Sequence, residues 1–588
     1  MRHRPLLVLP ILLALSVLSR AAFAAGWEDA TAATIGATKE WSNKLELADI
    51  NGDGLVDILF ANGAGYAAPE GGEQNRAFLN QGAGKPFLEV SEAVFGAMPD
   101  QTRAIKAGDV DGDGDLDLVV GNTFETQSRL YLGDGAGGFV EATVLLPQKP
   151  ASIGDLELGD VDGDGDLDLV LADWGPGEAG GAGGVTQLWL NDGEGGFSDV
   201  TATQMPAVPV SWSWEMDLAD VDNDLDLDVL VSCKTCPGSF LFHNDGAGQF
   251  VDASDQLPQF GNNYEFEAID LDGDEFVDLI TINDGPGATE HIFLGDGIGG
   301  FDDATDELWP ADANVQGDDN MVAFLDVDSD GDADFVIAGL FGNDDRLILN
   351  DGTGHLSLQG NAFAPANSSG SLGIGVADLD GDHKLDVVFS EGESPQDADR
   401  VFLGVDVPVD TAAPRISLVD VGQVGDALLV RARVHDNKSP VMGHDFTEVV
   451  VELLCPEVVK QPMTWYGGAL WRVDLDPPDC ASALQVCAAD AAGNRVCGSE
   501  VPLDGGGSTG GSTGESTDGS TSDTGTGNVP TSGDAPTTGS ASSGGQTTYG
   551  DPPGSLGDGG GCGCRQEAPG GWALLLGLGG LLGRRRRR

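Results

Sequence analysis

The residues of this sequence with the clearest chemistry are carboxylates that alternate within a short recurring motif. The pattern Asp-x-Asp/Asn-x-Asp-x-x-x-Asp occurs seven times, and its starts are 50 to 60 residues apart. In a tight loop, side chains at positions 1, 3, 5 and 9 can turn toward one centre, where a backbone carbonyl from position 7 can join them. Calcium takes about 6–8 oxygen ligands at roughly 2.3–2.6 Å. The motif therefore predicts seven calcium loops, numbered here one to seven in chain order.

The predicted calcium ligands are four side chains from each loop. In chain order they are Asp49, Asn51, Asp53 and Asp57; Asp109, Asp111, Asp113 and Asp117; Asp160, Asp162, Asp164 and Asp168; Asp220, Asp222, Asp224 and Asp228; Asp270, Asp272, Asp274 and Asp278; Asp326, Asp328, Asp330 and Asp334; and Asp378, Asp380, Asp382 and Asp386. Glycine at position 6 permits a sharp turn, but Leu225, Glu275 and His383 replace it in three loops. These three side chains must adopt the dihedral angles of the turn, and Asn51 lowers the ligand charge of loop one.

Three or four carboxylates within a few ångströms repel one another strongly, so a bound cation is expected to be structural. Solvated acidic turns would explain a single motif of this kind, but not seven in register. A helical EF-hand is excluded because strand patterns flank the loops and the glutamate at position 12 is missing.

The segments around each loop have the pattern of β-strands. Residues two and four positions before each loop are apolar and those between are mostly charged, which predicts a half-buried strand. A short apolar run such as 118–120 follows each loop and predicts a second, buried strand. After each of the first six loops comes a turn of the form Asn/Gly-Asp/Gln-Gly-x-Gly, which predicts a hairpin. The aspartates therefore lie on β-loop-β connections.

Seven units of about 54 residues run from Trp27 to about Gly404 when each unit is opened at the aromatic residue after a glycine turn. Four strands of roughly 5–6 residues fit that length. Radial repetition of such sheets gives a β-propeller, whereas a calcium β-roll would repeat at about nine residues. The sequence predicts an all-β chain with a seven-bladed propeller at residues 26–404.

The aspartate loops and their trailing glycine turns resemble FG-GAP/VCBS repeats, the unit also found in the propeller of integrin α-subunits. The resemblance covers residues 27 to about 404. It implies a propeller with calcium loops on one rim. Because the ligand face varies within that family, the resemblance does not identify a ligand.

Short alternating strands follow in residues 405–504 and have the length of a small immunoglobulin-like β-sandwich. Cys487 could pair with Cys497, and Cys455 with Cys480, although spacing alone leaves the connectivity open. Cys233 and Cys236 are interpreted as a local staple, because no thioredoxin-like pattern surrounds them.

Both ends of the chain carry targeting patterns. Residues 1–25 have the basic start, apolar run and small-residue cleavage site of a signal peptide. Residues 505–561 are a Gly/Ser/Thr-rich stretch expected to form a disordered stalk. Residues 562–588 contain a Cys-Gly-Cys motif, a short apolar helix and five arginines. They resemble the myxobacterial C-terminal sorting tail (MYXO-CTERM), which implies processing near Cys562 or Cys564 and attachment at the cell surface; a plain C-terminal anchor is the alternative.

The formal net charge of −69 argues against binding to nucleic acids or to anionic membrane surfaces. The membrane contact expected is therefore through the C-terminal tail alone. The seven histidines are scattered, with no paired zinc spacing, and no catalytic constellation stands out. The leading hypothesis is a monomeric, surface-displayed binding or adhesion module for glycans or proteins that carries Ca²⁺.

Two alternatives stay open: a calcium-dependent enzyme that degrades extracellular polysaccharides, and a purely structural surface protein. Trp212, Trp214 and Tyr264, which precede loops four and five, are candidate contact residues for a ligand. Packing between blades is the competing explanation for these three side chains.

Overall fold

The computed structural model describes residues 26–503 except 178–180, 182, 284, 286–287, 341–344, 361, 364–369, 393–397 and 425–426. The predicted signal peptide, stalk and sorting tail lie outside the described residues. Within the described part the fold is all-β, with only short helices. No helix in this part is long and apolar enough to cross a membrane.

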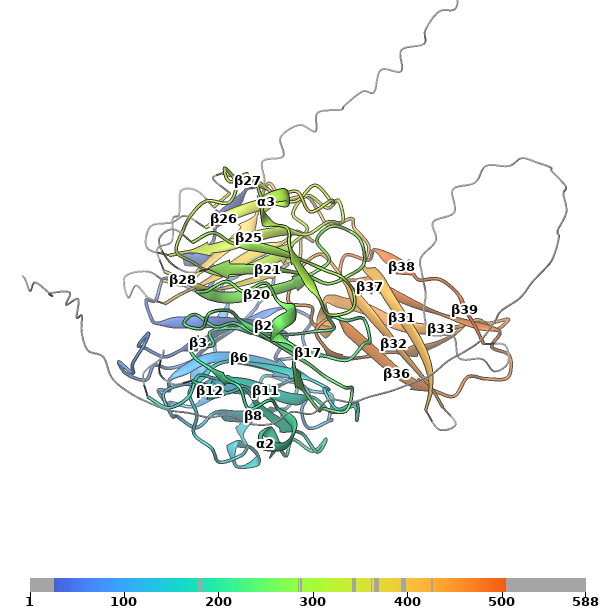
Figure 1. Ribbon diagram of the computed structural model, residues 1–588, viewed down its shortest axis with the longest axis horizontal. Helices are drawn as coiled ribbons and strands as arrows, with labels where there is room; N and C mark the ends of the chain where they lie inside the picture. The colour runs from blue at the N-terminus through green and yellow to red at the C-terminus, as the bar shows by residue number, and fades with distance from the viewer. Residues whose placement is uncertain are drawn as a thin grey trace, which may run out of the picture. The chain divides into compact units, whose positions relative to one another are not determined.

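The described strands before residue 405 form repeated antiparallel sheets of four strands (Figure 1). Six of these sheets, in chain order, are β2(Ser42–Ala48), β3(Asp57–Asn62), β4(Arg76–Leu79), β5(Leu88–Glu89); β6(Thr102–Gly108), β7(Asp117–Asn122), β8(Arg129–Gly133), β9(Phe139–Glu141); β10(Ile153–Gly159), β11(Asp168–Asp173), β13(Gln187–Leu190), β14(Ser198–Asp199); β16(Met216–Ala219), β17(Asp228–Val231), β18(Phe240–His243), β19(Val251–Asp252); β20(Asn263–Ile269), β21(Asp278–Asn283), β22(His291–Gly295), β23(Phe301–Asp303); and β24(Asp319–Leu325), β25(Asp334–Gly339), β26(Arg346–Leu349), β27(Ser357–Gln359).

A further four-stranded sheet joins the two ends of this region. It contains β28(Ser371–Ala377), β29(Asp386–Glu391), β30(Arg400–Gly404) and the N-terminal β1(Trp27–Asp29). Trp27 pairs with Gly404, and Asp29 pairs with Phe402. The sequence unit that opens at Trp27 is therefore not a single sheet, because the strand after each glycine turn is the outer strand of the preceding sheet.

The first strands of successive sheets contact one another in the order β2, β6, β10, β16, β20, β24 and β28, and β28 contacts β2. The described sheets therefore form a closed ring of propeller-like repeats. The second strand of each sheet is its most buried part, as in β3, where Ile58 and Phe60 have no exposed surface. The charged residues between the apolar positions of the first strands, such as Glu46 and Lys106, line a cavity of about 200 Å³.

The short elements between the sheets are η1(Thr31–Ala33), α1(Ser91–Phe95), η2(Thr143–Leu145), α2(Thr201–Gln204), η3(Ser254–Gln256) and α3(Thr305–Leu308), with a two-stranded ribbon of β12(Gly184–Val185) and β15(Pro209–Val210). They connect the outer strands and carry none of the predicted metal ligands.

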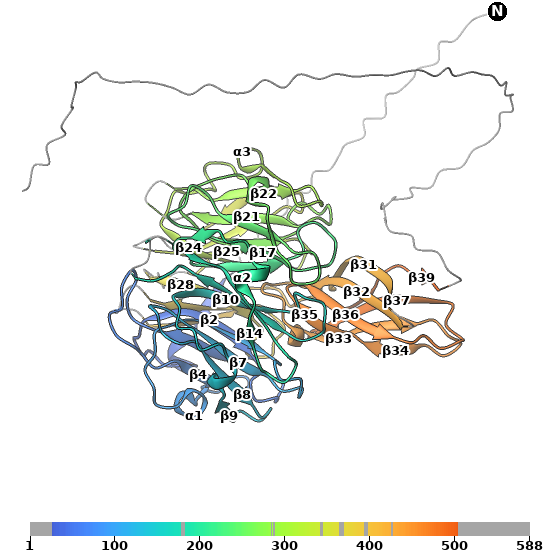
Figure 2. The same cartoon turned by 60° about the horizontal axis from the view of Figure 1, so that its bottom comes forward.

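Residues 415–502 form two further sheets around one apolar core (Figure 2). One contains β31(Arg415–Val424), β32(Ala427–His435), β36(Leu470–Leu475) and β35(Thr464–Gly467); the other contains β34(Val459–Pro462), β33(Phe446–Leu453), β37(Ala483–Asp490), β38(Arg495–Cys497) and β39(Val501–Pro502), and η4(Gly443–Asp445) precedes β33. We call this part the sandwich. Its disulfides join Cys455 to Cys480 and Cys487 to Cys497. In the ring, Cys233 is bonded to Cys236, so all three pairings considered from the sequence are present.

Candidate metal centres

Each aspartate loop joins the first and second strands of one sheet. Position 1 directly follows the first strand, and position 9 is the first residue of the second strand, as with Asp109 after β6 and Asp117 at the start of β7. All 28 predicted ligand side chains lie in these seven β-loop-β connections. The strands on either side fix both ends of every loop.

The backbone of every loop is left-handed at two positions. At position 6 the φ angles are 83° for Gly54, 94° for Gly114, 106° for Gly165, 63° for Leu225, 72° for Glu275, 89° for Gly331 and 60° for His383. The three residues that replace glycine thus adopt the same turn, in a conformation that costs a side chain about 1–2 kcal/mol. Position 4 is left-handed as well, and the sequence analysis did not identify it; its residues are Gly52, Gly112, Gly163, Asn223, Gly273, Ser329 and Gly381.

Backbone amides hold the carboxylates in place. In loop two, the Asp109 carboxylate accepts hydrogen bonds from the N–H groups of Gly112 at 2.9 Å and Gly114 at 3.0 Å. Asp113 accepts one from Asp115 at 2.9 Å, and a bond from position 7 to position 5 recurs in every loop. The carboxylates are oriented by the turn itself, so the loops are preorganised for a cation.

The aspartate at position 9 is almost completely buried in every loop. Both oxygens of Asp117 accept backbone hydrogen bonds, from Val110 at 2.9 Å and Gly133 at 2.8 Å, and the same pair of bonds occurs in the other loops. Burial raises the pKa of Asp117 to about 6, of Asp57 to about 7 and of Asp168 to about 8. Without a cation the carboxyls of Asp57 and Asp168 retain part of their protons at neutral pH, whereas a bound cation would favour the carboxylate form.

The donor atoms of the loops are close enough to share one ion. Carboxylate oxygens of Asp109, Asp111 and Asp117 lie within 4.8 Å of one another, as do those of the corresponding residues of loop three. Two oxygens that each lie about 2.4 Å from one calcium ion are at most about 4.8 Å apart. The donor set contains only oxygen atoms in these two loops, so it fits a hard divalent cation.

Neighbouring loops are linked by an asparagine after the third strand, a role that its place in a glycine turn does not reveal in the sequence. Asn191 donates side-chain hydrogen bonds to the carbonyl of Val110 in loop two at 2.8 Å and to that of Leu167 in loop three at 3.0 Å. Asn80 similarly bonds to Leu379 in loop seven. These bonds couple each loop involved to the loop before it.

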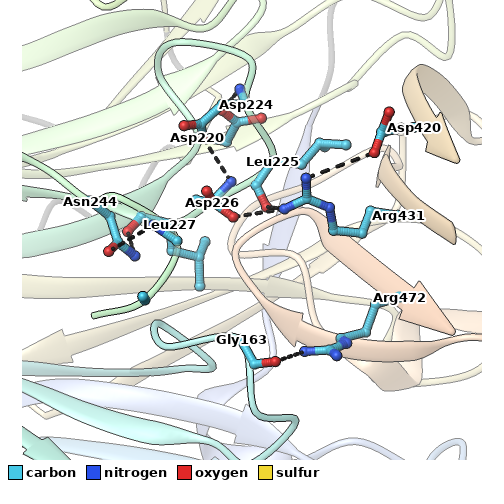
Figure 3. Close-up of polar contacts among 12 residues, drawn as sticks. Gly163, Asp220, Asp224, Leu225, Asp226, Leu227, Asn244, Asp420, Arg431 and Arg472 are labelled. Carbon is cyan, nitrogen blue, oxygen red and sulfur yellow. Dashed lines mark hydrogen bonds and ion pairs between the residues drawn. The ribbon is translucent and has the colours of Figure 1, made fainter. Parts of the chain in front are cut away.

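Arginines of the sandwich reach three of the loops. Arg472 is paired with Asp160 at 2.5 Å, Arg433 with Asp220 at 2.7 Å and Arg415 with Asp270 at 2.9 Å. Each of these aspartates occupies position 1. Figure 3 shows Arg431 directed at Asp226 and at the carbonyl of Leu225, with 2.7 Å between the guanidinium and the Asp226 carboxylate. The sandwich therefore supplies positive charge to loops three, four and five.

A cluster of aromatic side chains lies near the start of the first strands, at the end opposite the aspartate loops. We call it the aromatic cluster; it consists of Tyr66, Phe124, Trp174, Trp212, Trp214 and Tyr264 with Arg103 and Lys234. The Lys234 ammonium lies 4.9 Å from the Tyr66 ring centre, 5.0 Å from that of Trp212 and 4.6 Å from that of Tyr264.

The sequence analysis offered three of these side chains as ligand contacts. Trp214 and Tyr264 are buried, which favours packing for these two, whereas Trp212 is only half-buried. The indole N–H groups of Trp174 and Trp212 have no hydrogen-bond partner among the described residues. Both N–H groups are buried, so only the partly exposed ring surface of Trp212 can meet a ligand directly.

The loop geometry agrees with a comparison to protein families. The chain carries FG-GAP-like repeats. The family model matches residues 49–120, 109–171, 177–231 and 326–389, which together include every aspartate loop except loop five. No curated protein matches the chain.

Solved structures give only distant similarity. A lectin of Agrocybe aegerita, described as recognising non-reducing terminal N-acetylglucosamine, is 18% identical with a TM-score of 0.36, over 55% of this chain and 80% of the lectin. The biofilm matrix protein Bap1 of V. cholerae is 16% identical with a TM-score of 0.32, over 82% and 76% of the two chains. An ancestral GH74 enzyme is 11% identical with a TM-score of 0.36, over 80% and 63%. At these scores the similarity carries no functional argument.

Proposed function

We propose that the chain is an exported, calcium-binding β-propeller of seven blades that acts as a binding or adhesion module for glycans or proteins at the cell surface. The blade count is supported by the closed chain of contacts among the first strands. The signal-peptide and sorting-tail patterns in residues 1–25 and 562–588 are the basis for export and surface attachment. The three disulfides suit an oxidising compartment.

Calcium is the cation that the all-oxygen loops suit best. In loops one and two, the described residues include no arginine, lysine or histidine that forms an ion pair with the predicted ligands. The carboxylates of these loops therefore need charge from solution. Calcium would hold the two strands of each sheet together at the loop, and the asparagine bridges would pass this restraint to the neighbouring sheet.

The observation that carries the binding function is the aromatic cluster. Tyrosine and tryptophan combine a large apolar surface with a polar group and are common at recognition sites. Here Tyr66, Trp212 and Lys234 are each partly exposed. A ligand with an apolar face, such as a sugar, would stack on the partly exposed rings of Tyr66 and Trp212 beside the Lys234 ammonium.

The test is a binding screen of the purified protein against glycans and matrix proteins in the presence of calcium. Trp212→Ala should abolish the binding that the wild-type protein shows. Phe276→Ala removes an aromatic side chain from an aspartate loop at the opposite end of the strands, and it should leave binding unchanged. If no glycan or matrix protein binds, the proposal is refuted. Release of reducing ends from acidic polysaccharides would identify the protein as an enzyme instead.

A further inference from the structure

Loop four (Asp220–Asp228) differs from the other loops in the side chain that the third strand of its sheet presents. In β18 this residue is His243, immediately before Asn244, whose N–H donates to Asp228 at 2.8 Å. The equivalent position in the other six sheets is the residue before the one whose N–H donates to position 9. It is leucine in each: Leu79, Leu132, Leu190, Leu294, Leu349 and Leu403. An imidazole has replaced an apolar group beside one metal loop.

The imidazole is directed at two of the loop's carboxylates. His243 Nδ1 lies 3.3 Å from Asp228 Oδ2 and 3.8 Å from Asp222 Oδ2. Ligand atoms of these three residues all lie within 4.8 Å of one another. The buried Asp222 Oδ1 makes no hydrogen bond to the described residues, and the Asp228 carboxylate faces His243 Nδ1. The three side chains therefore present nitrogen and oxygen donors toward a common centre.

A second contact orients the ring. The Gln256 Oε1 atom and the Nε2 edge of the His243 ring both lie beside Gly299, which places the amide oxygen where it can accept from Nε2. A proton on Nε2 donated to Gln256 leaves the lone pair of Nδ1 facing the carboxylates. Histidines that bind metals are commonly oriented by such an outer hydrogen bond.

The same loop has lost features that suit calcium. Asn223 and Leu225 stand at the two left-handed positions where loops one to three have glycine. Arg433 is paired with Asp220, the position 1 ligand, and Arg431 hydrogen bonds to the Leu225 carbonyl and to the Asp226 carboxylate, as Figure 3 shows for Arg431. Arg433 thus takes up a carboxylate that a calcium ion with about 6–8 oxygen ligands would use, whereas Arg431 neutralises a carboxylate outside the predicted ligand set.

The remaining charge still favours a divalent cation. Five aspartates lie in loop four, and two arginines balance two of the charges. A donor set that combines imidazole nitrogen with carboxylate oxygen suits first-row transition metals better than it suits a hard cation such as calcium. Three protein ligands with a further position for water is a coordination that zinc adopts.

We propose that His243, Asp222 and Asp228 form a site for a zinc-class divalent transition metal, distinct in ligand chemistry from the calcium loops. The site stands on its own donor set, so it does not require that calcium occupy the other loops. Nothing in the linear spacing indicated it, because His243 lies 15 residues beyond Asp228 on another strand of the sheet.

The probe is Co²⁺, whose visible absorption bands report nitrogen and oxygen coordination. The purified full chain is titrated with Co²⁺ in excess calcium, so that hard-cation loops are occupied. We expect one equivalent of Co²⁺ to bind, to develop bands and to be displaced by Zn²⁺. His243→Leu should remove the bands, and because leucine occupies this position in the six other sheets, the variant should fold. Gln256→Ala should weaken binding by about 10–100-fold.

The matched control is His383→Leu, since His383 also lies beside an aspartate loop, with its Nδ1 3.6 Å from Asp378, but offers no second carboxylate among the ion pairs described for it. This control should bind Co²⁺ as the wild type does. Absence of the bands from the wild-type protein, or their persistence in His243→Leu, would overturn the site. If only the calcium proposal fails, the wild-type protein will contain no bound calcium, but His243→Leu and His383→Leu will still differ in Co²⁺ binding.

Discussion

The left-handed residue at position 6 allows the turn of the aspartate loops to be tested by two opposite substitutions. Gly114 has φ 94°, and a Cβ atom at this position would meet no heavy atom within 4 Å. In Gly114→Ala the native state therefore bears only the conformational cost of a left-handed side chain, about 1–2 kcal/mol. The loss of unfolded-state entropy offsets about 0.4–1 kcal/mol of it. The expected net loss is up to about 1.6 kcal/mol, with a central value of about 0.8 kcal/mol.

The converse change is Glu275→Gly. Glu275 is exposed, has φ 72°, and uses its backbone rather than its side chain to bond to Asp270 and to Arg433. Glycine at this position should therefore stabilise the protein by a similar amount. Urea denaturation in excess calcium measures both changes as midpoint shifts of about 0.3 M for an m-value of ~3 kcal/mol/M. Equal shifts in the same direction for the two variants would refute the reasoning.

Two further perturbations test the interior of the ring and its contact with the sandwich. Arg433→Gln leaves the carboxylate of Asp220 buried without its partner at 2.7 Å. The variant should lose about 3–5 kcal/mol of unfolding free energy in calorimetry or urea unfolding, and Asp220→Asn should restore part of that loss. An unchanged unfolding free energy would contradict the buried ion pair. Burial raises the pKa of Glu267 from 4.5 to about 8, so the folded state binds its proton more tightly than the unfolded chain. The stability from this group is lost as pH rises from about 4.5 through 8. Glu267→Gln should flatten the fall of the melting temperature over that range, and an unchanged profile would contradict the assignment.

Much of the fold follows from local patterns in the sequence. The alternation before each loop, the apolar run after it and the glycine turns identified three strands of each sheet, because each pattern reflects one backbone period or one turn. The offset between repeat and sheet was not predictable in this way. Trp27 resembles the aromatic residue that opens every unit, but only the pairing of Trp27 with Gly404 shows that it closes the last sheet.

The candidate site was predictable where donors share one loop and not where they come from distant strands. The four ligands of loop two lie within nine residues. Arg433 and Asp220, in contrast, meet across 213 residues of sequence, and the imidazole of His243 reaches loop four from another strand. The charged residues Glu46 and Lys106 were expected on one face of half-buried strands. The cavity that they line is closed by the ring together with residues of the sandwich such as His435, and no local period encodes that arrangement.

The central idea is that divalent cations compensate clustered carboxylates and hold the sheets of the ring together. Elemental analysis of the purified protein, followed by thermal melting with and without EGTA, tests it most directly. We predict several equivalents of bound Ca²⁺ per chain and a large drop in the melting temperature once the metal is removed. A folded protein that contains no Ca²⁺ and melts at the same temperature in chelator would contradict it.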